Sequence, residues 1–470
     1  MSKLTLAKLV LYLLIPIQLL IFTFLVPPFQ KPDEQTHFEQ SLIISKGFLS
    51  CQKKSNNMVP LEKKYIDFIK TPYLDLLTHG GSKLPVQIFL KDLLSNKQDN
   101  KKINFNIDHL CSFPIISYLP QAFSLIISSM LKLNPIMSLY FGRLFMGILG
   151  YFWFLYLYKR IAKNFKLILL FTFALPMTLH QISSFSYDTV HIMLALTFFT
   201  LIINENIGVI NHTTTKYIRL FFVLFLFLLS KKVGYEVFFL FIFLIPFKIK
   251  PIIISSLIFA PFYLLSKLTG SYDLQYFSNN QIFNPIRQIN FLFSNPINII
   301  KVIAVTTVER FSFYLQSLIG IFGWLEYGLD PLSYLLYGLF LVYVIVETRL
   351  ASSLHKNKTI LLFIALIISY VFIILLGYVF YTVTGILVAD GIQGRYFIPF
   401  VPFIILLIIQ YTQNIKFLWN IKIGENIKTV IYLLAIIYLI SGTFYSVFNR
   451  YYLTLNYFMN FINFKNLINY

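Results

Sequence analysis

Asp33, Glu34 and His37 stand together in the stretch PDEQTHF, directly behind the first apolar run of a chain that has only 19 acidic residues. Asp33 and His37 are four residues apart and share one face of a helix, whereas Glu34 points about 100° away. A carboxylate in such a setting could serve as a general base, and the three side chains are also compatible with a divalent metal ion. An ordinary helix start explains them equally well, because Pro32 and first-turn acids suit the positive end of a helix.

Lys231, Lys232 and Arg395 are the basic residues whose positions are hardest to explain. The two lysines occupy a very short turn between apolar runs, on the side of the membrane where the positive-inside rule disfavours them. A bound anion would account for them. Arg395, in GIQGRYF, lies between a glycine and a helix start, where a guanidinium and free backbone N–H groups could meet a phosphate. A glycine turn with an arginine at the lipid headgroups is the alternative.

The elements that must position these residues are membrane helices. Of the 470 residues, 57% are hydrophobic and only 12% are charged, against roughly 25% in soluble domains. Repeated apolar runs are long enough to cross a hydrocarbon core of about 30 Å. The sequence therefore predicts an all-α polytopic membrane protein with one integral domain over residues 1–470. The formal charge of +20 fits contact with anionic membrane lipids better than binding to nucleic acid.

The basic residues also predict how the chain threads the membrane. Lys3 and Lys8 place the N-terminus in the cytoplasm, so that residues 27–138 form an extracytoplasmic first loop. Within this loop the apolar run 113–131 is expected to lie along the outer face as a juxtamembrane helix. This choice puts the basic stretch 158–166 in the cytoplasm.

Later loops agree with this threading and give roughly eleven crossings, within a range of 10 to 13. One of the shortest expected crossings is the apolar run from Val237 to Phe247. Residues 269–331 form a second outer segment, in which 285–325 cannot be assigned to crossings from the sequence.

Uncommon polar residues gather at the ends of the helices that face outward. An ionisable group at a membrane boundary is costly to desolvate, so such residues usually face a cavity or a partner. Any one of them could instead be a charge that reaches the interface. Taken together they form one candidate site, which comprises Asp33, Glu34, His37, Arg143, Asp188, Lys231, Lys232, Asp390 and Arg395.

Cys51 and Cys111 are the only cysteines, and both fall in the first outer loop. An oxidising compartment permits a disulfide between them, which would close a loop of about 60 residues. Two unpaired thiols in the same loop are the alternative, because sequence spacing cannot show whether the two Cα atoms come close.

Seven motifs, in this order and spacing, resemble a family of bacterial polytopic membrane proteins of unknown function. The resemblance runs from about residue 10 to residue 447, and it rests on PDEQTHF, YLPQA, GRLF, LPMTLHQISSFSYD, KKVGY, IGIFGWLE and GIQGRYFIPFVP. That family looks like a branch of the GT-C glycosyltransferases, which take a sugar from a polyprenyl-phosphate donor on the outer face of the membrane. The resemblance implies a GT-C-like helix bundle with juxtamembrane helices in the first outer loop.

The resemblance also implies roles for individual residues. Asp33 matches the catalytic acid position, and Glu34 and His37 accompany it. The donor phosphate would be bound by Lys231, Lys232 and Arg395. The substrate-binding residues would be Arg143, Asp188, Tyr118, Gln121, Trp324, Gln393 and Tyr396. The stretch SFPIISYLP departs from the Pro-Pro-Leu-Tyr-Tyr run of related sequences, which leaves acceptor contacts there open.

The expected function is therefore the inverting transfer of a hexose or pentose from a polyprenyl-phosphate donor to a glycan, lipid or protein acceptor. It would take place at the outer face of the cytoplasmic membrane, in cell-envelope polysaccharide biosynthesis. No cofactor is implied beyond a divalent metal that Asp33, Glu34 and His37 could bind. A polysaccharide polymerase or ligase is the main alternative, but this function would not explain why Asp33 and Glu34 are present.

A transporter should carry polar residues near the membrane midplane and internal repeats, and the sequence shows neither. An inert structural protein is disfavoured by the one-sided polar cluster.

Overall fold

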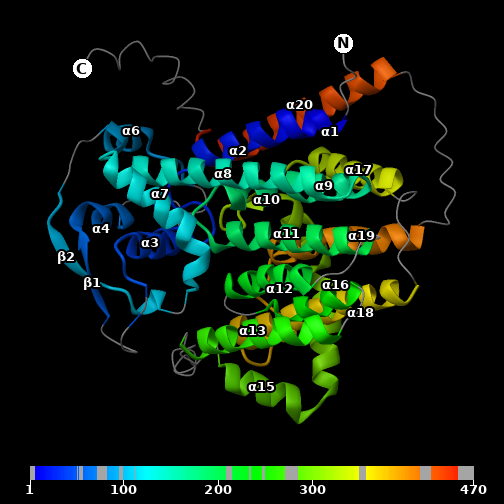
Figure 1. Ribbon diagram of the computed structural model, residues 1–470. Helices are drawn as coiled ribbons and strands as arrows, with labels where there is room; N and C mark the ends of the chain where they lie inside the picture. Colours follow the sequence, from blue (N-terminus) through cyan, green and yellow to red (C-terminus); the bar gives the residue numbers. More distant parts are fainter. Residues whose placement is uncertain are drawn as a thin grey trace.

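A computed structural model shows a bundle of long helices with a smaller polar lobe at one end (Figure 1). The structure describes residues 6–49, 51, 57–70, 73, 82–94, 99–111, 113–207, 214–231, 234–245, 249–269, 284–348, 356–412 and 425–453. The chain is an all-α polytopic membrane protein, and its short strands contribute only two small two-stranded sheets among these residues.

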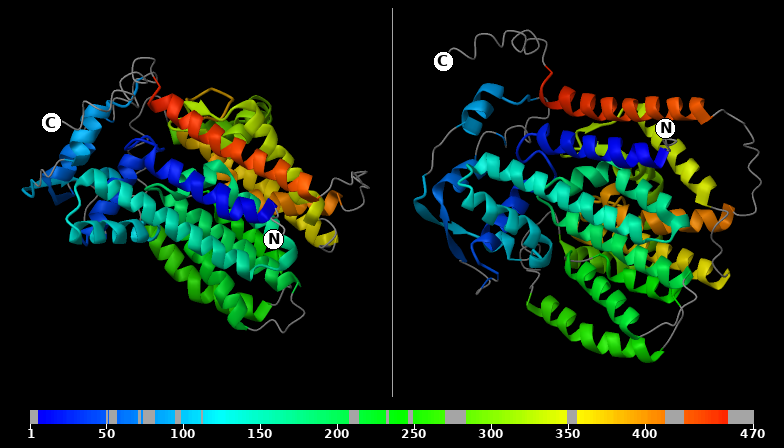
Figure 2. Two further views of the ribbon diagram at one scale, coloured as in Figure 1. Left: turned by 90° about the horizontal axis from the view of Figure 1, so that it is seen from above. Right: turned by 45° about the horizontal axis from the view of Figure 1, so that its top comes forward.

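The bundle is built from helices that run in both directions along a common axis (Figure 2). Its N-terminal half comprises α1 (Leu6–Leu9), the π-helix η1 (Val10–Leu14), α2 (Ile15–Phe24), α8 (Pro135–Arg160), η5 (Lys163–Phe165), α9 (Lys166–Ala174), α10 (Pro176–Ile182), α11 (Tyr187–Ile207) and α12 (Thr214–Leu229). Its C-terminal half comprises η6 (Glu236–Leu244), α13 (Ile249–Thr269), α15 (Pro285–Ser294), α16 (Ile297–Gly320), α17 (Pro331–Thr348), α18 (Lys356–Tyr381), η8 (Gly394–Phe400), α19 (Val401–Thr412) and α20 (Glu425–Tyr451). Strands β3 (Ile321–Phe322) and β4 (Tyr327–Gly328) form a hairpin between α16 and α17.

Seven helices in the described part of the chain are long and apolar enough to cross a membrane, or up to nine if each of two bent pairs is one span. This count covers the described residues alone and is below the roughly eleven crossings, within a range of 10 to 13, expected for the whole chain. The expected crossing from Val237 to Phe247 is one that is not counted, because the structure forms the nine-residue 3₁₀ helix η6 there. At about 2 Å per residue such a helix covers roughly 18 Å, which is too short for a core of about 30 Å.

The apolar run 113–131 forms the short helix η4 (Ile115–Tyr118) followed by α7 (Leu119–Met130). The 12 residues of α7 extend roughly 18 Å, less than the thickness of the membrane core. Ser124 and Ser128 are buried on the face toward the protein, whereas Phe123 and Met130 are exposed. A helix with its apolar residues outward suits the membrane surface, so this geometry favours the juxtamembrane prediction.

The polar lobe covers one end of the bundle. It contains α3 (Glu34–Ser45), β1 (Met58–Glu62), α4 (Lys63–Ile69), α6 (Val86–Leu94), β2 (Lys102–Asn106) and η3 (Asp108–Leu110). Strands β1 and β2 pair antiparallel, with Met58 opposite Asn106 and Glu62 opposite Lys102. A disulfide joins Cys51 to Cys111, whose Cα atoms are 5.7 Å apart. The lobe has an aromatic core of its own, in which Phe29, Phe38 and Phe68 are buried.

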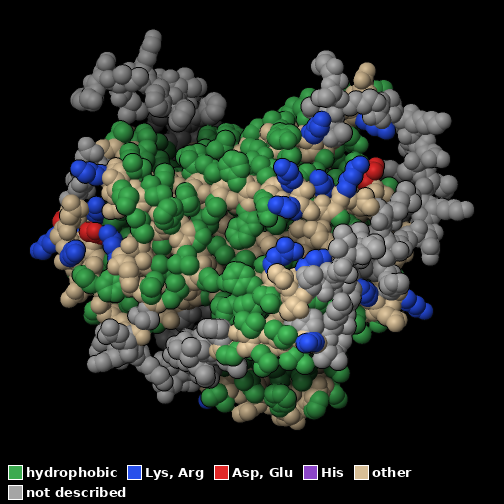
Figure 3. All heavy atoms as spheres, viewed as in Figure 1, with side chains coloured by type: hydrophobic (Ala, Val, Ile, Leu, Met, Phe, Trp, Pro, Cys, Tyr) green, Lys and Arg blue, Asp and Glu red, His purple; other side chains and the backbone are tan. Residues whose placement is uncertain are grey.

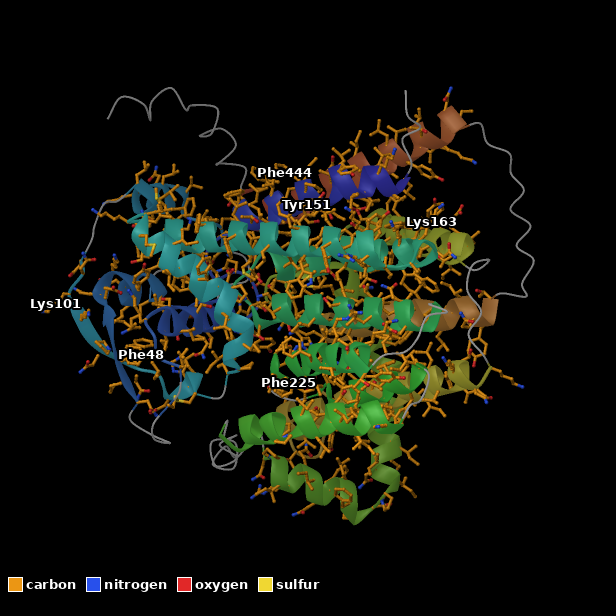
Figure 4. All side chains as sticks on the ribbon, in the orientation of Figure 1. Phe48, Lys101, Tyr151, Lys163, Phe225 and Phe444 are labelled. Atoms are coloured by element: carbon orange, nitrogen blue, oxygen red, sulfur yellow. A yellow bond between two sulfur atoms is a disulfide. The ribbon has the colours of Figure 1, made fainter. Side chains whose placement is uncertain are left out.

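Asp188 and the C-terminal end of α11 lie at opposite ends of the bundle. The side chain of Asn204, near the end of α11, accepts a hydrogen bond from Ala162 N (3.0 Å) just beyond α8, so the C-terminal ends of both helices meet. Asp188, at the start of α11, therefore lies at the opposite end, roughly 25 Å away along the helix. Lys and Arg side chains gather at the end away from the lobe, with a second group on the lobe itself (Figure 3). Figure 4 labels Lys163 at the former end and Lys101 on the lobe.

Candidate functional site

Asp33 lies where the chain leaves the bundle and enters the lobe. It is the N-cap of α3 and has a left-handed backbone with φ of 56°. Lys31 and Glu34 on either side are fully buried, whereas 47% of the Asp33 side chain is exposed. Among these three charged residues, Asp33 therefore presents the acid that a substrate could reach.

Glu34 is held inside the protein by Arg143. The guanidinium of Arg143 donates two hydrogen bonds to the Glu34 carboxylate, one from Nε to Oε1 at 2.8 Å and a second from Nη2 to Oε2. Both side chains are fully buried. Arg143 also donates to the carbonyl of Pro27 at 2.9 Å. The pair thus fixes the 27–34 turn against α8. This geometry disfavours the catalytic role expected for Glu34, because the guanidinium of Arg143 already balances the charge of its carboxylate.

Lys31 anchors the same turn on its other side. Its ammonium donates to Ser183 Oγ at 3.0 Å and to the backbone carbonyls of Ser183 and His180 at the C-terminal end of α10. Burial lowers the pKa of Lys31 well below its usual value. The three acceptors match the three N–H groups of an ammonium, and a cation suits the negative end of a helix.

Arg395 approaches Asp33 from the other half of the chain. Its Nη2 donates to Asp33 Oδ2 at 3.4 Å, and the guanidinium is almost entirely buried. The preceding Gly394 lets η8 lie directly on α16, since a Cβ there would stand 2.1 Å from the backbone nitrogen of Leu318. Gly394 N also donates to Ser317 Oγ at 2.8 Å. Gly394, the second glycine of GIQGRYF, is therefore required for the close approach that positions Arg395.

Asp188 and Lys231 form a second ion pair, with Lys231 Nζ donating to Asp188 Oδ1 at 2.8 Å. Burial lowers the pKa of Lys231, an effect that Asp188 partly offsets. Three aromatic rings surround the ammonium, with centroids at 4.5 Å (Tyr396), 4.9 Å (Tyr187) and 5.1 Å (Tyr235). Rings at these distances stabilise a cation through their electron-rich faces.

Tyr396 connects the two ion pairs. Its ring centroid lies 4.5 Å from Lys231 Nζ and 5.4 Å from the guanidinium carbon of Arg395. A chain of direct contacts therefore runs from Asp33 through Arg395 and Tyr396 to Lys231 and Asp188. We call these five residues the charged cluster. All five were candidate site residues, and the structure brings them together from four separate segments of the sequence.

His37 lies beside this cluster without facing Asp33 as a shared metal ligand. Its Nδ1 is 2.7 Å from the hydroxyl of Tyr118, and its ring packs edge-on against Tyr187 at 4.7 Å. Burial lowers the pKa of His37 to about 4, so the ring is neutral at pH 7. Among the described residues, no group of three or more His, Cys, Asp and Glu side chains is arranged to hold a metal ion.

The remaining candidates lie in different surroundings. Gln121 is buried and donates to the carbonyl of Ser186 at 2.9 Å, close in sequence to Asp188. Gln393 is the N-cap of η8 and lies two residues before Arg395. Trp324 is exposed in the β3–β4 hairpin, and no described contact joins it to the charged cluster. Asp390 pairs with Arg310 at 2.9 Å. Lys232 lies outside the described residues.

Three further residues were not anticipated: Tyr187 and Tyr235 around the Lys231 ammonium, and the buried Lys31 two residues before Asp33. Tyr187 directly precedes Asp188, and Tyr235 follows Lys231 by four residues. Adjacency to a candidate charge was the available signal. It was weak in a chain with 31 tyrosines.

Comparison with known proteins adds the family. Residues 17–404 match a family of unknown function, DUF2142, which is described as a predicted membrane protein. The chain belongs to this family. The DUF2142 match includes every residue of the charged cluster, from Asp33 to Tyr396. No curated protein and no solved structure matches the chain.

Proposed function

We propose that this DUF2142 protein is a membrane glycosyltransferase that moves a sugar from a polyprenyl-phosphate donor to an acceptor hydroxyl. The observation that carries the proposal is the pairing of a half-exposed carboxylate, Asp33, with two buried cations that share the ring of Tyr396. Such a transfer needs a base for the acceptor and positive charge for the departing phosphate.

The proposed reaction is a single displacement. The acceptor oxygen forms a bond to the anomeric carbon while the bond from that carbon to the phosphate oxygen breaks. Asp33 takes the acceptor proton, and Arg395 and Lys231 stabilise the negative charge on the released polyprenyl phosphate. Asp188 is held by Lys231 and is almost fully buried, so it is poorly placed as a covalent nucleophile. Within the charged cluster, Asp33 is the one accessible carboxylate, which supports inversion at the anomeric carbon.

The proposal places the charged cluster and the polar lobe on the extracytoplasmic side of the cytoplasmic membrane. Lys and Arg side chains at the far end of the bundle support this orientation, because cytoplasmic ends carry the basic excess (Figure 3). Helix α1 lies at that far end as well (Figure 2). The acceptor would then be a glycan, lipid or protein of the cell envelope.

Transfer in membrane vesicles tests the proposal. Purified protein is reconstituted with radiolabelled polyprenyl-phosphate hexoses or pentoses and with envelope glycan acceptors. Asp33→Asn should lower transfer by about 10²- to 10⁴-fold while the protein remains folded. Asp99→Asn is the matched control, because Asp99 is an acid of similar side-chain exposure (48% against 47%) that pairs with Lys63 on the lobe.

The same assay separates the competing functions. One sugar added per acceptor supports a glycosyltransferase, whereas a ladder of lengthened products or transfer of a whole polymer identifies a polymerase or ligase. Equal rates in Asp33→Asn and wild type would refute the role of Asp33. Failure of the wild type with every lipid-linked sugar would refute the proposed function itself.

A further inference from the structure

A groove lies on the flank of the bundle, where α16 meets the β3–β4 hairpin and the start of α17. Its volume is about 670 Å³, within the range of small-molecule sites. Phe311, Leu315 and Ile319 of α16 form one wall, and Leu325 and Tyr334 lie opposite them. None of these residues belongs to the charged cluster.

Helix α16 separates the groove from the charged cluster. Tyr314 and Ser317 are buried on the face that receives Gly394 and η8, and Phe311 and Leu315 lie on the exposed face. At 100° per residue, the centres of these two faces are roughly 110° apart. Arg395 does not line the groove, so a ligand there contacts a different face of α16 from the one that η8 covers.

The groove offers mainly carbon surface, since most of its polar side chains are engaged within the protein. Gln316 Nε2 donates to Ser312 Oγ at 3.5 Å, and the hydroxyl of Tyr334 donates to the carbonyl of Gly320 at 2.8 Å. The carboxylate of Glu326 is bound by Arg450. A polar ligand would find few free partners here, whereas a hydrocarbon would lose nothing on entry.

The hairpin presents an apolar side chain over the groove at some conformational cost. Leu325 has φ of 68°, a left-handed backbone that residues other than glycine rarely adopt. Phe311, Leu315 and Leu325 are 54%, 47% and 37% exposed. This surface continues into the exposed apolar face of α17, a candidate membrane span. The groove therefore opens toward the hydrocarbon of the bilayer.

We infer that the groove binds one acyl chain of a phospholipid from the surrounding membrane. Acyl chains are the apolar molecules present where the groove opens, and its lining by α16, the hairpin and the start of α17 gives one chain contacts that a single helix face does not offer. The position of α16 argues against the polyprenyl chain of the proposed sugar donor, whose phosphate would lie beside a different face of that helix. The inference does not depend on transferase activity.

Lipid retention tests the inference directly. The protein is purified from membranes in a mild detergent, washed, and analysed by native mass spectrometry and lipid extraction. Wild type should retain about one phospholipid per chain. Leu315→Trp fills the groove and should lower retention at least fivefold. Leu339→Trp is the matched control, because Leu339 is an exposed leucine of α17 that does not line the groove, and this variant should retain the wild-type amount.

A second measurement does not require the groove to be filled. Replacing Phe311 by the photoreactive p-benzoylphenylalanine should crosslink an alkyne-tagged phospholipid more than the same replacement at Leu339. Equal retention by Leu315→Trp and Leu339→Trp, or equal crosslinking at the two positions, overturns the inference. So does recovery of a polyprenyl phosphate, rather than a phospholipid, as the retained lipid.

Discussion

The carboxylate of Asp33 lies 3.4 Å from the guanidinium of Arg395, although 362 residues separate them in the sequence. Asp33 is held by the turn that follows α2, and Arg395 by the contact of η8 with α16. The pair therefore reports whether the first and last parts of the bundle are correctly assembled. It is also the point at which the proposed base and the proposed phosphate-binding residues meet.

Removing the buried ammonium should impair use of the donor. We expect Lys231→Met to lower donor turnover by about 10²- to 10³-fold, because loss of one preorganised charge that stabilises a transition state has this effect. Lys216→Met is the matched control, since Lys216 pairs with Glu205 at the opposite end of α11. Transfer rates over a range of donor concentrations measure the change. Unchanged donor use in Lys231→Met would remove Lys231 from the proposed mechanism.

The ion pair between Glu34 and Arg143 should matter for folding more than for chemistry. Breaking a buried pair by removing one partner costs about 3–5 kcal/mol, because the other charge remains buried without compensation. We expect Glu34→Gln and Arg143→Met each to lower the temperature at which the detergent-purified protein loses its monodisperse peak.

The double variant Glu34→Gln/Arg143→Met should recover part of this loss, since neither uncompensated charge remains. Additive destabilisation in the double variant would show that the two side chains are not coupled. A stable Glu34→Gln protein without transferase activity would support a catalytic role for Glu34.

Acidification should destabilise the protein through His37. The folded protein binds a proton at His37 only near pH 4, whereas the unfolded chain does so near pH 6.5. Between these values the unfolded state binds more protons, so stability falls as the pH falls through this window. The contribution of His37 amounts to about 3 kcal/mol. Thermal unfolding from pH 7 to pH 4.5 should show a smaller decline for His37→Gln, and parallel curves for both proteins would contradict this assignment.

Opposite ends of the bundle should label from opposite sides of the membrane. In intact cells we expect Lys101→Cys on the lobe to react with an impermeant thiol reagent, and Lys163→Cys to react only after the membrane is opened. The native cysteines are joined in a disulfide and give no background. Reaction of Lys163→Cys from outside would reverse the proposed orientation and place the charged cluster in the cytoplasm.

The membrane class and the four charged members of the cluster followed from the sequence, because charge is scarce in an apolar chain and each exception stands out, whereas Tyr396 was named only through the family resemblance. Their pairing did not follow. Glu34 and Arg143 are 109 residues apart, and nothing in either local sequence specifies which acid meets which base. The aromatic rings around Lys231 could not be predicted for the opposite reason, since tyrosine and phenylalanine are abundant throughout the chain.

Hydropathy also could not show the shape of each apolar segment. The residues of η6 are as apolar as those of a crossing helix, but they form a 3₁₀ helix that is too short to cross. Conversely, hydropathy assigns no role to the polar Gln18 inside the first apolar run. Its amide donates to Thr443 Oγ1 at 2.7 Å and joins α2 to α20 within the bundle, as polar side chains between membrane helices commonly do.

The left-handed backbone of Asp33 decides which substitutions at this position can be interpreted. Aspartate and asparagine adopt this conformation more readily than other residues with a side chain, so Asp33→Asn removes the charge and leaves the turn unstrained. Asp33→Ala would remove the charge and add backbone strain of roughly 1–2 kcal/mol in the turn that orients Lys31 and Glu34. Inactivity of the alanine variant would therefore not distinguish loss of the base from distortion of this turn. Asp33→Gly would relieve the strain but loosen the same turn.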